Sequence, residues 1–492
     1  FPQTTFIIIM SRRNTHQDTS IDRLKGSLQK QHGKYGDPTW LAPRLVARSD
    51  EPSRIDQGNR ISSSEYLDEP EVLNAKVDVI VTLLKKAKCC VAYTGAGLSR
   101  AAGIGDYASK QNSINSNIPK LKSNYDALPT LSHRVLAALE REGYLHHLVQ
   151  QNHDGIPQKA GFPQEKINEI HGGWYDPSNP VVQFNESLRH DFFNWMEDME
   201  KKTDLCLCLG TSLSGMNADR MADTPAERSK KSRSNVLGTI IINLQQTRLD
   251  SQSALRIWAK LDDTFKLLAE KLNLDLTPIS IEPPISEYGK DQYVIPYNAK
   301  GEYDPNSRMV WDIRDHSKII ISNPLSSKHQ RTGEIFKKDN QGNYVIHLGR
   351  SQYRFGRWWI KCAMEGKWPY VLPFVNIHPK MLSAKIDCVD LVSEDNDVIM
   401  KEEDISPPNI IIKQTHKLLN NESHEWSLSI PSHDVSSVTW ILHPTFSPPE
   451  ISSTEYPFHI KRIGWGTFTV RACITLKTGN ILKSKHSLSF NQ

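Results

Sequence analysis

The chain has 492 residues, of which 38% are hydrophobic and 24% charged, and its formal net charge is +4. This length allows two or three domains, and so small a net charge gives no sign of a polyanion-binding protein. Seven cysteines without a Cys-x-x-Cys pair do not form a disulfide framework, so we expect a reducing compartment. No stretch approaches the ~20 consecutive apolar residues of a membrane span.

Residues 1–65 are rich in Ser, Arg, Asp, Gln and Asn and lack sustained periodicity, which predicts a disordered N-terminal segment. A helix is expected within residues 67–88, where Asp68 is the expected cap and Pro70 fits the first turn. Four apolar residues share one face of this helix: Leu73, Val77, Ile80 and Leu84.

The apolar run from Cys89 to Tyr93 predicts a buried parallel strand that ends in the glycine-rich turn GAGLSRAAG. Gly95 and Gly97 have two interpretations: close packing where a strand bends into a helix, or a turn that presents backbone N–H groups to an anion. The turn alone is no dinucleotide fingerprint, because Arg100 stands where that motif has its third glycine. A helix-compatible run follows.

Two further apolar runs, DLCLCLGTSLSG and GTIIINLQQT, also end in polar residues. Between the runs, PTLSHRVLAALEREG predicts a helix that ends at Gly143, and ALRIWAKLDDTFKLLAEKLNL predicts a strand or loop followed by a helix. Strand-like runs that alternate with helices predict a Rossmann-like parallel α/β sheet.

The composition changes at about residue 276, and residues 276–405 are expected to be a proline-rich linker with a small β-rich segment. Its short runs include KIIISN, NYVIHLG, RWWIKC and YVLPFVN. The stretch YRFGRWWIKCAMEGKWPY mixes cations with aromatic residues, but alternating Trp and Ile favour a core strand, so direct nucleic-acid binding is not indicated. Residues 406–490 consist of strand-like runs between turn residues, which predicts an immunoglobulin-like all-β sandwich.

Three short motifs in the first half carry residues suited to chemistry. The stretch QQNHDGI offers side chains that could orient a carboxamide and ribose hydroxyls, although such residues also form ordinary turns. His171 in EIHGGW is a candidate general base, although a lone histidine is more often structural. Residues 210–212 place hydrogen-bond donors at the end of a predicted strand.

The order of the motifs GAGLSxxAGIxDY, QNxDG, IHG, PVVQFNE, LGTSL and INLQQT resembles the sirtuins, the NAD-dependent protein-lysine deacylases. The resemblance covers roughly residues 70–275 and implies a sirtuin-like domain over residues 66–275 with NAD as cofactor. It also implies that the acyl-lysine oxygen attacks the nicotinamide ribose, that nicotinamide leaves, and that O-acyl-ADP-ribose is formed.

Site residues follow from the resemblance by position. His171 and Asn152 are expected to be catalytic. The expected NAD-binding residues are Gly95, Ala96, Gly97, Ser99, Ala102, Asp106, Tyr107, Gln151, Asn152, Asp154, Gly210, Thr211, Ser212, Asn243 and Leu244. The segment expected to pair with the substrate backbone by strand addition contains Val182, Phe184 and Asn185.

The chain departs from the family pattern in four places. No cysteine lies between His171 and Pro180, so the family's zinc module of two cysteine pairs cannot form there and no metal is expected. The family's Pro-Asp-Phe-Arg is Gly-Asp-Tyr-Ala at residues 105–108, which lacks the Arg. The Ile of Asn-Ile-Asp is His153, and the Gly of Phe-Gly-Glu is Asn185.

The C-terminal motifs HEWSL, LHPTF, YPFHI and GWGTF resemble the YEATS domains, which are sandwich readers of acylated lysine. The resemblance implies a reader domain over residues 406–490, in which two aromatic rings hold the flat acyl amide between them. The implied pocket residues are His443, Thr445, Phe446, Gly464 and Trp465.

Together the two resemblances predict an NAD-dependent protein-lysine deacylase coupled to an acyl-lysine reader. Its expected partners are acylated proteins, above all histones, and no membrane. A histone substrate implies the nucleus, with the cytoplasm as the alternative. One alternative function is a protein ADP-ribosyltransferase or NAD hydrolase, because the departures lie near the expected nicotinamide end. Another is a catalytically idle chromatin-binding scaffold.

Overall fold

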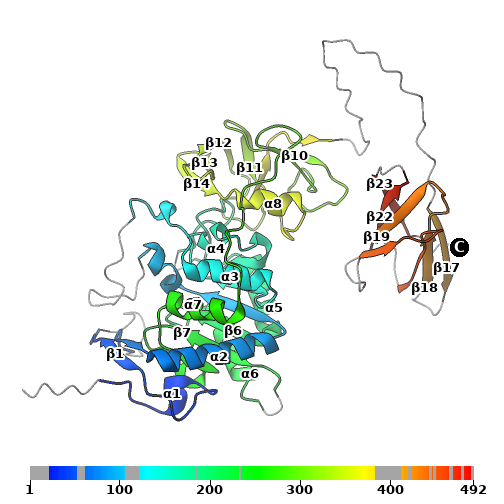
Figure 1. Ribbon diagram of the computed structural model, residues 1–492. Helices are drawn as coiled ribbons and strands as arrows, with labels where there is room; N and C mark the ends of the chain where they lie inside the picture. Colours follow the sequence, from blue (N-terminus) through cyan, green and yellow to red (C-terminus); the bar gives the residue numbers. More distant parts are fainter. Residues whose placement is uncertain are drawn as a thin grey trace, which may run out of the picture. The chain divides into compact units, whose positions relative to one another are not determined.

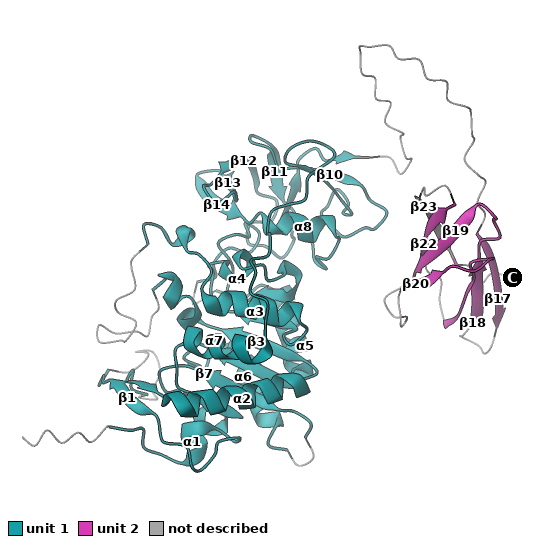
Figure 2. Cartoon of the chain, viewed as in Figure 1, with its two compact units in different colours: residues 1–388 teal, residues 389–492 magenta. Residues whose placement is uncertain are grey.

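The computed structural model describes most of the chain, which forms two compact units, residues 1–388 and 389–492 (Figure 2). The described residues are 22–51, 61–105, 121–183, 186–231, 234–382, 412–418, 424–442, 446, 450–464, 469–477 and 481–488. Across these ranges, no helix combines the length and the apolar character needed to cross a membrane.

A parallel sheet of six strands forms the centre of the first unit, as the sequence predicts. The strands are β3 (Cys90–Thr94), β4 (His147–Gln150), β5 (Ile167–Glu169), β6 (Leu205–Leu209), β7 (Gly238–Ile242) and β8 (Leu255–Ile257). Their order in the sheet is β5-β4-β3-β6-β7-β8, so the direction of winding reverses between β3 and β6. Ligands of open α/β sheets bind at the carboxyl ends of the strands at such a point.

Helices cover both faces of this sheet (Figure 1). One face carries α2 (Pro70–Lys86), α3 (Leu131–Arg141) and α7 (Leu261–Leu272). The other face carries α5 (His190–Lys202) and α6 (Arg220–Arg228). Alternate strand residues enter the two cores: Ala92 packs with the first set of helices and Tyr93 with the second. Burial on both faces explains why β3, β6 and β7, which are buried at every position, consist mainly of apolar residues.

Helix α2 begins at Pro70 as predicted, but Asp68 is not its cap. The cap position is Glu69, and Asp68 is buried, where its carboxylate accepts hydrogen bonds from Lys76 Nζ at 2.7 Å and from the backbone N–H of Trp258 at 2.9 Å. The cap prediction is therefore wrong, because a partner distant in sequence holds the carboxylate instead.

Residues 22–51 are folded against the core, although the sequence predicts disorder over residues 1–65. They include α1 (Leu28–His32) and β1 (Arg44–Ala47), and β1 pairs with β2 (Glu65–Leu67). The Gln29 amide donates to Ser253 O at 2.9 Å, and Trp258 Nε1 donates to Gln31 O at 2.7 Å. These long-range contacts have no local signal in the sequence.

Residues 292–382, which we call the middle module, form two antiparallel sheets and a helix. Its strands are β9 (Gln292–Ile295), β10 (Met309–Asp312), β11 (Lys318–Ile321), β12 (Thr332–Lys338), β13 (Tyr344–Leu348), β14 (Ser351–Phe355), β15 (Phe374–Asn376) and β16 (Lys380–Met381). The sheet orders are β16-β10-β9 and β14-β13-β12-β11-β15. The apolar core of the module is continuous with the core on the α5 side of the parallel sheet.

The run RWWIKC lies in helix α8 (Trp358–Met364), so the expected strand there is wrong. The core prediction for the same run is confirmed, because Trp358, Trp359 and Ile360 are all buried. Consecutive apolar residues in so short a run fit either a strand or one buried helical turn, and tertiary packing decided between them.

The second unit is an all-β structure of two antiparallel sheets, as predicted. Its strands are β17 (Lys413–Leu418), β18 (His424–Ser429), β19 (Val435–Ile441), β20 (Glu450–Ser453), β21 (Ile460–Gly464), β22 (Thr469–Leu476) and β23 (Ile481–Ser487). The sheet orders are β17-β18-β21 and β20-β19-β22-β23. Trp426 and Trp440 are buried in the shared core, where Trp440 Nε1 donates to Phe458 O at 3.1 Å.

The turns that follow β3 and β6 touch backbone to backbone. Gly97 N donates to Gly210 O at 2.8 Å, and a Cβ added at Gly97 would lie 2.8 Å from Gly210 Cα. Gly210 has φ +58°, which glycine adopts without the strain that a side chain brings. The close-packing interpretation of the glycine turn is therefore confirmed, and it is compatible with a turn that presents N–H groups to an anion.

We predict that Gly97→Ala destabilises the protein by about 2 kcal/mol, because the new methyl group has to displace backbone rather than a side chain. Chemical denaturation measures the change in unfolding free energy. Gly105→Ala is the matched control, since a Cβ there would meet nothing within 4 Å. Equal effects of the two substitutions would contradict the packing argument.

Candidate functional site

The structure brings four predicted motifs together at the carboxyl edge of β3, β4, β6 and β7. Gln151 Nε2, after β4, donates to Thr211 Oγ1 at 2.9 Å. Asn152 Nδ2 donates to Gly95 O at 3.0 Å, and Asn243 Nδ2 donates to Thr211 O at 3.3 Å. Side-chain amides thus join turns that lie up to about 150 residues apart in sequence into one network.

Ser99 and Asp154 form the buried base of this network. Ser99 Oγ donates to Asp154 Oδ2 at 2.6 Å, and Asn152 Nδ2 donates to Ser99 Oγ at 3.2 Å. The other carboxylate oxygen of Asp154 accepts a hydrogen bond from Ile156 N at 2.9 Å. Ser99 and Asp154 are buried, whereas Asn152 is partly exposed, so the pair supports Asn152 from beneath.

The edge of the sheet also presents backbone donors. Among the described residues, no backbone acceptor lies within hydrogen-bonding reach of the N–H groups of Ala96, Thr211 or Ser212. Ala96 begins a single 3-10 turn, residues 96–98, and a second such turn, residues 100–102, lies in the stretch whose sequence is compatible with a helix. Unsatisfied N–H groups at the carboxyl edge of a parallel sheet suit an anionic ligand such as a diphosphate.

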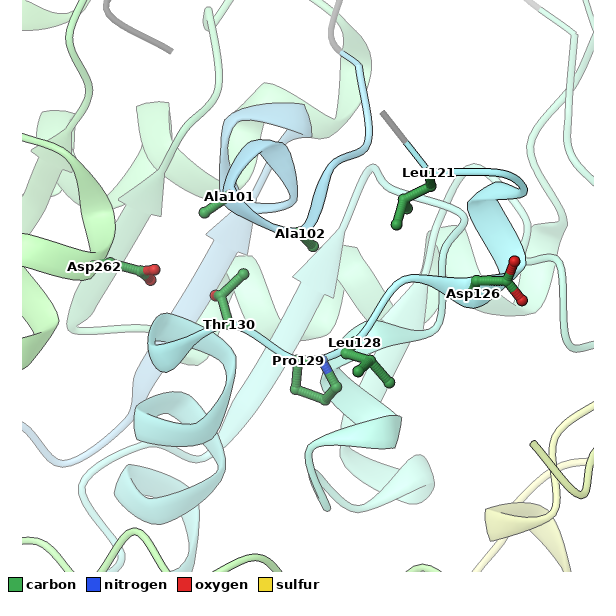
Figure 3. Close-up of a pocket in the computed structure, with 8 residues that line it drawn as sticks. All are labelled: Ala101, Ala102, Leu121, Asp126, Leu128, Pro129, Thr130 and Asp262. Carbon is green, nitrogen blue, oxygen red and sulfur yellow. The ribbon is translucent and has the colours of Figure 1, made fainter. Parts of the chain in front are cut away.

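Ala102 lines a cavity of about 330 Å³ (Figure 3). The short turn that carries Ala102 forms one wall, and the segment before helix α3 forms another. The lining residues are Ala101, Ala102, Leu121, Asp126, Leu128, Pro129, Thr130 and Asp262. Ala102 therefore borders a cavity, which is required of a residue that is expected to border a ligand.

The loop after β7, which carries Asn243 and Leu244, is held by a residue that the sequence did not single out. Arg256 is buried and donates to Asn243 O at 2.9 Å, to Gln245 O at 2.7 Å and to Asp250 Oδ1 at 2.7 Å. Leu244 is itself buried, and its carbonyl oxygen accepts a hydrogen bond from the N–H of Tyr66 in β2. The expected adenosine side of the site is therefore fixed by a buried cation and by the N-terminal strand pair.

His171 lies just after β5 and is partly exposed. Burial lowers its pKa to about 4, and the neighbouring His153 lowers the pKa further, whereas a hydrogen bond with the Gln151 backbone opposes the shift. The imidazole is therefore neutral at pH 7 and able to accept a proton. Val182 N donates to His171 O at 3.0 Å, which ties the expected substrate segment to the loop of the expected base.

His153, which stands in place of the family's Ile, anchors the same loop. Its Nδ1 lies 2.8 Å from Gly172 O, and its carbonyl oxygen accepts a hydrogen bond from Trp174 N at 2.8 Å. The substitution therefore adds a hydrogen bond between the turn after β4 and the turn after β5.

Glu169, in β5, was not predicted by the sequence reasoning. Its side chain is only 2% exposed, and a Cβ added at Gly173 would lie 2.7 Å from Glu169 Oε1. Burial raises its pKa to about 8, with Asp176 adding to the shift, while hydrogen bonds from Gln158 and Gln150 oppose it. The sequence offered no local signal for Glu169, because the burial of β5 follows from the fold.

Several predicted residues lie outside the described residues: Asp106, Tyr107, Phe184, Asn185, His443, Thr445 and Trp465. In the second unit the structure does place Phe446 beside Gly464, since a Cβ added at Gly464 would lie 3.0 Å from Phe446 Cζ. The Phe446 ring also meets Trp426 edge-on, with the ring centroids 5.9 Å apart. The two described members of the expected reader pocket are therefore neighbours.

We predict that Glu169→Gln raises the melting temperature by about 2–4 °C at pH 8 and by less at pH 5. The folded-state pKa of Glu169 lies above that of an unfolded Glu, so raising the pH from 4.5 to 8 favours the unfolded state of the wild type only. Thermal melts at both pH values measure the difference. Glu270→Gln, on the exposed side of α7, is the control, and a Glu169→Gln effect independent of pH would contradict the prediction.

Comparisons with known proteins follow the same division into two parts. Residues 416–492 match the model of the YEATS family. The human NAD-dependent protein deacetylase sirtuin-7 is 29% identical over 287 residues, which is 48% of this chain and 70% of that protein. The Arabidopsis thaliana NAD-dependent protein deacetylase SRT1 is 26% identical over 268 residues, which is 46% of this chain and 55% of that protein.

Among solved structures, one described as Sir2Tm bound to a propionylated peptide is 22% identical, with a TM-score of 0.34, and the match covers 41% of this chain and 100% of that chain. The N-terminal half of this chain is homologous to the sirtuin-type NAD-dependent protein deacetylases, as its motifs predicted, and residues 416–492 form a YEATS-family domain.

Proposed function

We propose that the chain is an NAD-dependent protein-lysine deacylase that acts on acylated proteins, histones above all, and that its C-terminal unit binds acyl-lysine. The observation that carries the proposal is the convergence of the turns after β3, β4, β6 and β7 on one edge, with His171 beside Gln151. Homology to proteins named NAD-dependent deacetylases supports the same conclusion.

The site residues divide into binding, orienting and proton-accepting groups. The N–H groups of Ala96, Thr211 and Ser212 would bind the diphosphate of NAD. Asn152, held by Gly95 O and by Ser99, would orient the ribose end. His171 would accept a proton through its neutral imidazole. NAD, when bound, supplies an electrophilic ribose carbon and nicotinamide as its leaving group.

The C-terminal unit would hold an acylated lysine against Phe446 at the end of β21, where Gly464 leaves room for the ring. A reader joined to an enzyme in one chain raises the concentration of neighbouring acyl-lysines at the enzyme, and in general this effect is of the order of millimolar for flexible linkers. Histone tails carry several such lysines close together, so this arrangement fits chromatin and a nuclear location.

We predict that His171→Ala lowers peptide-dependent formation of O-acyl-ADP-ribose by at least about 100-fold while NAD binding persists, because the substitution removes the proton acceptor and leaves the diphosphate donors. Mass spectrometry follows this product, and calorimetry follows NAD binding. His190→Ala, an exposed histidine at the start of α5, is the control.

Three outcomes of that experiment would contradict the proposal. Formation of O-acyl-ADP-ribose that survives His171→Ala removes the role of the base. Nicotinamide release by the wild type without any peptide indicates an NAD hydrolase or an ADP-ribosyltransferase. The absence of turnover in the wild type, with acyl-peptide binding retained, indicates a catalytically idle scaffold.

We predict that Phe446→Ala weakens binding of the full chain to an acetylated histone peptide by about tenfold, because a stacking ring is lost from the reader pocket. Fluorescence anisotropy compares acetylated with unmodified peptide in the absence of NAD. Ile463→Ala is the matched control, since Ile463 is an exposed neighbour of Gly464 on β21. A similar loss in both variants would argue against the pocket.

A further inference from the structure

The middle module meets the catalytic half where the turn after β4 and the turn after β5 lie together. A Cβ added at Gly155 would lie 2.7 Å from Tyr175 Cδ2 and 3.3 Å from the Trp358 ring. The rings of Tyr175 and Trp358 pack edge-on, with their centroids 5.1 Å apart, and Gly356 N donates to Tyr175 O at 3.2 Å. The first residue of α8 is thus in contact with both turns.

A row of buried polar side chains, most of them hydrogen-bonded to one another, runs from α8 to β5. Trp358 Nε1 donates to Gln164 Oε1 at 2.8 Å, and Gln158 Nε2 donates to the same oxygen at 3.3 Å. Gln158 also lies near enough to the Glu169 carboxyl group to lower its pKa, and that carboxyl group accepts a hydrogen bond from Gln150 Nε2 at 3.2 Å. This row of side chains ends at Glu169, which lies two residues before His171 in sequence and under the backbone of the loop after β5.

A second contact lies at the segment before α3. The guanidinium of Arg354, in β14, lies 3.9 Å from the centre of the Tyr125 ring. Tyr125 packs edge-on against Tyr175, and its carbonyl oxygen accepts a hydrogen bond from Lys159 Nζ at 2.9 Å. The middle module therefore contacts the surroundings of the site at two places, through Trp358 and through Arg354.

The geometry of such a row is sensitive to the loss of any one of its side chains. A buried amide oxygen that loses its donor pays the full cost of desolvation, and the loss weakens the hydrogen bonds of its neighbours. Displacement of a positioned catalytic group by as little as 1 Å is enough to slow a reaction strongly.

We propose that the middle module is a positioning element of the reaction centre. Trp358 packs against Gly155 and, through the buried glutamines, orients Glu169. The two turns that carry Asp154 and His171 are thereby held in register with each other. Trp358 is a positioning residue, not a catalytic one. The kinetic part of this inference rests on the proposed function, whereas its structural part does not.

The test compares Trp358→Phe with Trp359→Phe in the full chain. Both residues are buried in α8, and both substitutions replace an indole by a phenyl ring. Trp359 Nε1 has no hydrogen-bond partner within the described part of the chain. The substitution Trp359→Phe therefore removes the same side-chain volume as Trp358→Phe but breaks no hydrogen bond. Gln164→Leu, which removes the acceptor instead, is a second variant on the same path.

We expect Trp358→Phe and Gln164→Leu to lower kcat for peptide-dependent nicotinamide release by about tenfold, with KM for NAD changed less than about twofold. Trp359→Phe should stay close to the wild type in both constants. Hydrogen exchange followed by mass spectrometry should show faster exchange at residues 151–158 and 164–173 in the first two variants only, with β6 and β7 unchanged.

Hydrogen exchange decides the positioning claim whether or not the wild type turns over. Equal exchange in Trp358→Phe and Trp359→Phe would overturn it, as would equal kcat values in an active protein. A wild type without peptide-dependent release would instead overturn the proposed function.

Discussion

The contact between the turn after β3 and the turn after β6 is the constraint on which the rest of the site depends. Gly97 and Gly210 approach so closely that a side chain on either would enter the backbone of the other. This approach brings the N–H groups of Ala96 and Thr211 to one edge of the sheet. It also places Thr211 where the amides of Gln151 and Asn243 reach it. Without the two glycines, the four turns would have no common centre.

Burial shifts two ionisable groups near this edge in opposite directions, and both shifts favour the neutral form. The pKa of His171 falls to about 4 and that of Glu169 rises to about 8, with burial as the largest cause of each shift. At pH 7 the imidazole is therefore unprotonated, whereas the carboxyl group two residues earlier keeps its proton. A neutral Glu169 avoids an unpaired charge beneath the loop of the expected base.

The sequence predicted the parallel sheet from β3, β6 and β7, which are largely apolar runs that end in turn residues, whereas the shorter and more polar β4 and β5 carried no such signal. It also predicted which motifs meet, through their order along the chain. It did not predict the folding of residues 22–51, whose stability comes from contacts such as that of Gln29 with Ser253, more than 200 residues away. We predicted a strand for the residues of helix α8, because the hydrophobic periodicity of so short an apolar run does not distinguish a helix from a strand.

Residues that support the site from a distance were harder to predict than residues that are expected to contact a ligand. Arg256, Glu169 and Trp358 act through hydrogen bonds to distant carbonyl, amide or carboxyl groups, and nothing in their local sequence indicates those partners. Residues 276–405, expected to be a proline-rich linker with a small β-rich segment, contain a module whose core continues that of the parallel sheet. Linear composition alone did not reveal this packing.

The most direct test of the account is whether nicotinamide release by the purified full chain depends on an acylated peptide. The chain would be incubated with NAD and a panel of acyl-lysine histone peptides, and mass spectrometry would follow three products together. The account predicts that nicotinamide, O-acyl-ADP-ribose and deacylated peptide appear in equal amounts, and only when acylated peptide is present. Nicotinamide that appears at the same rate without peptide, or no products at all, would contradict it.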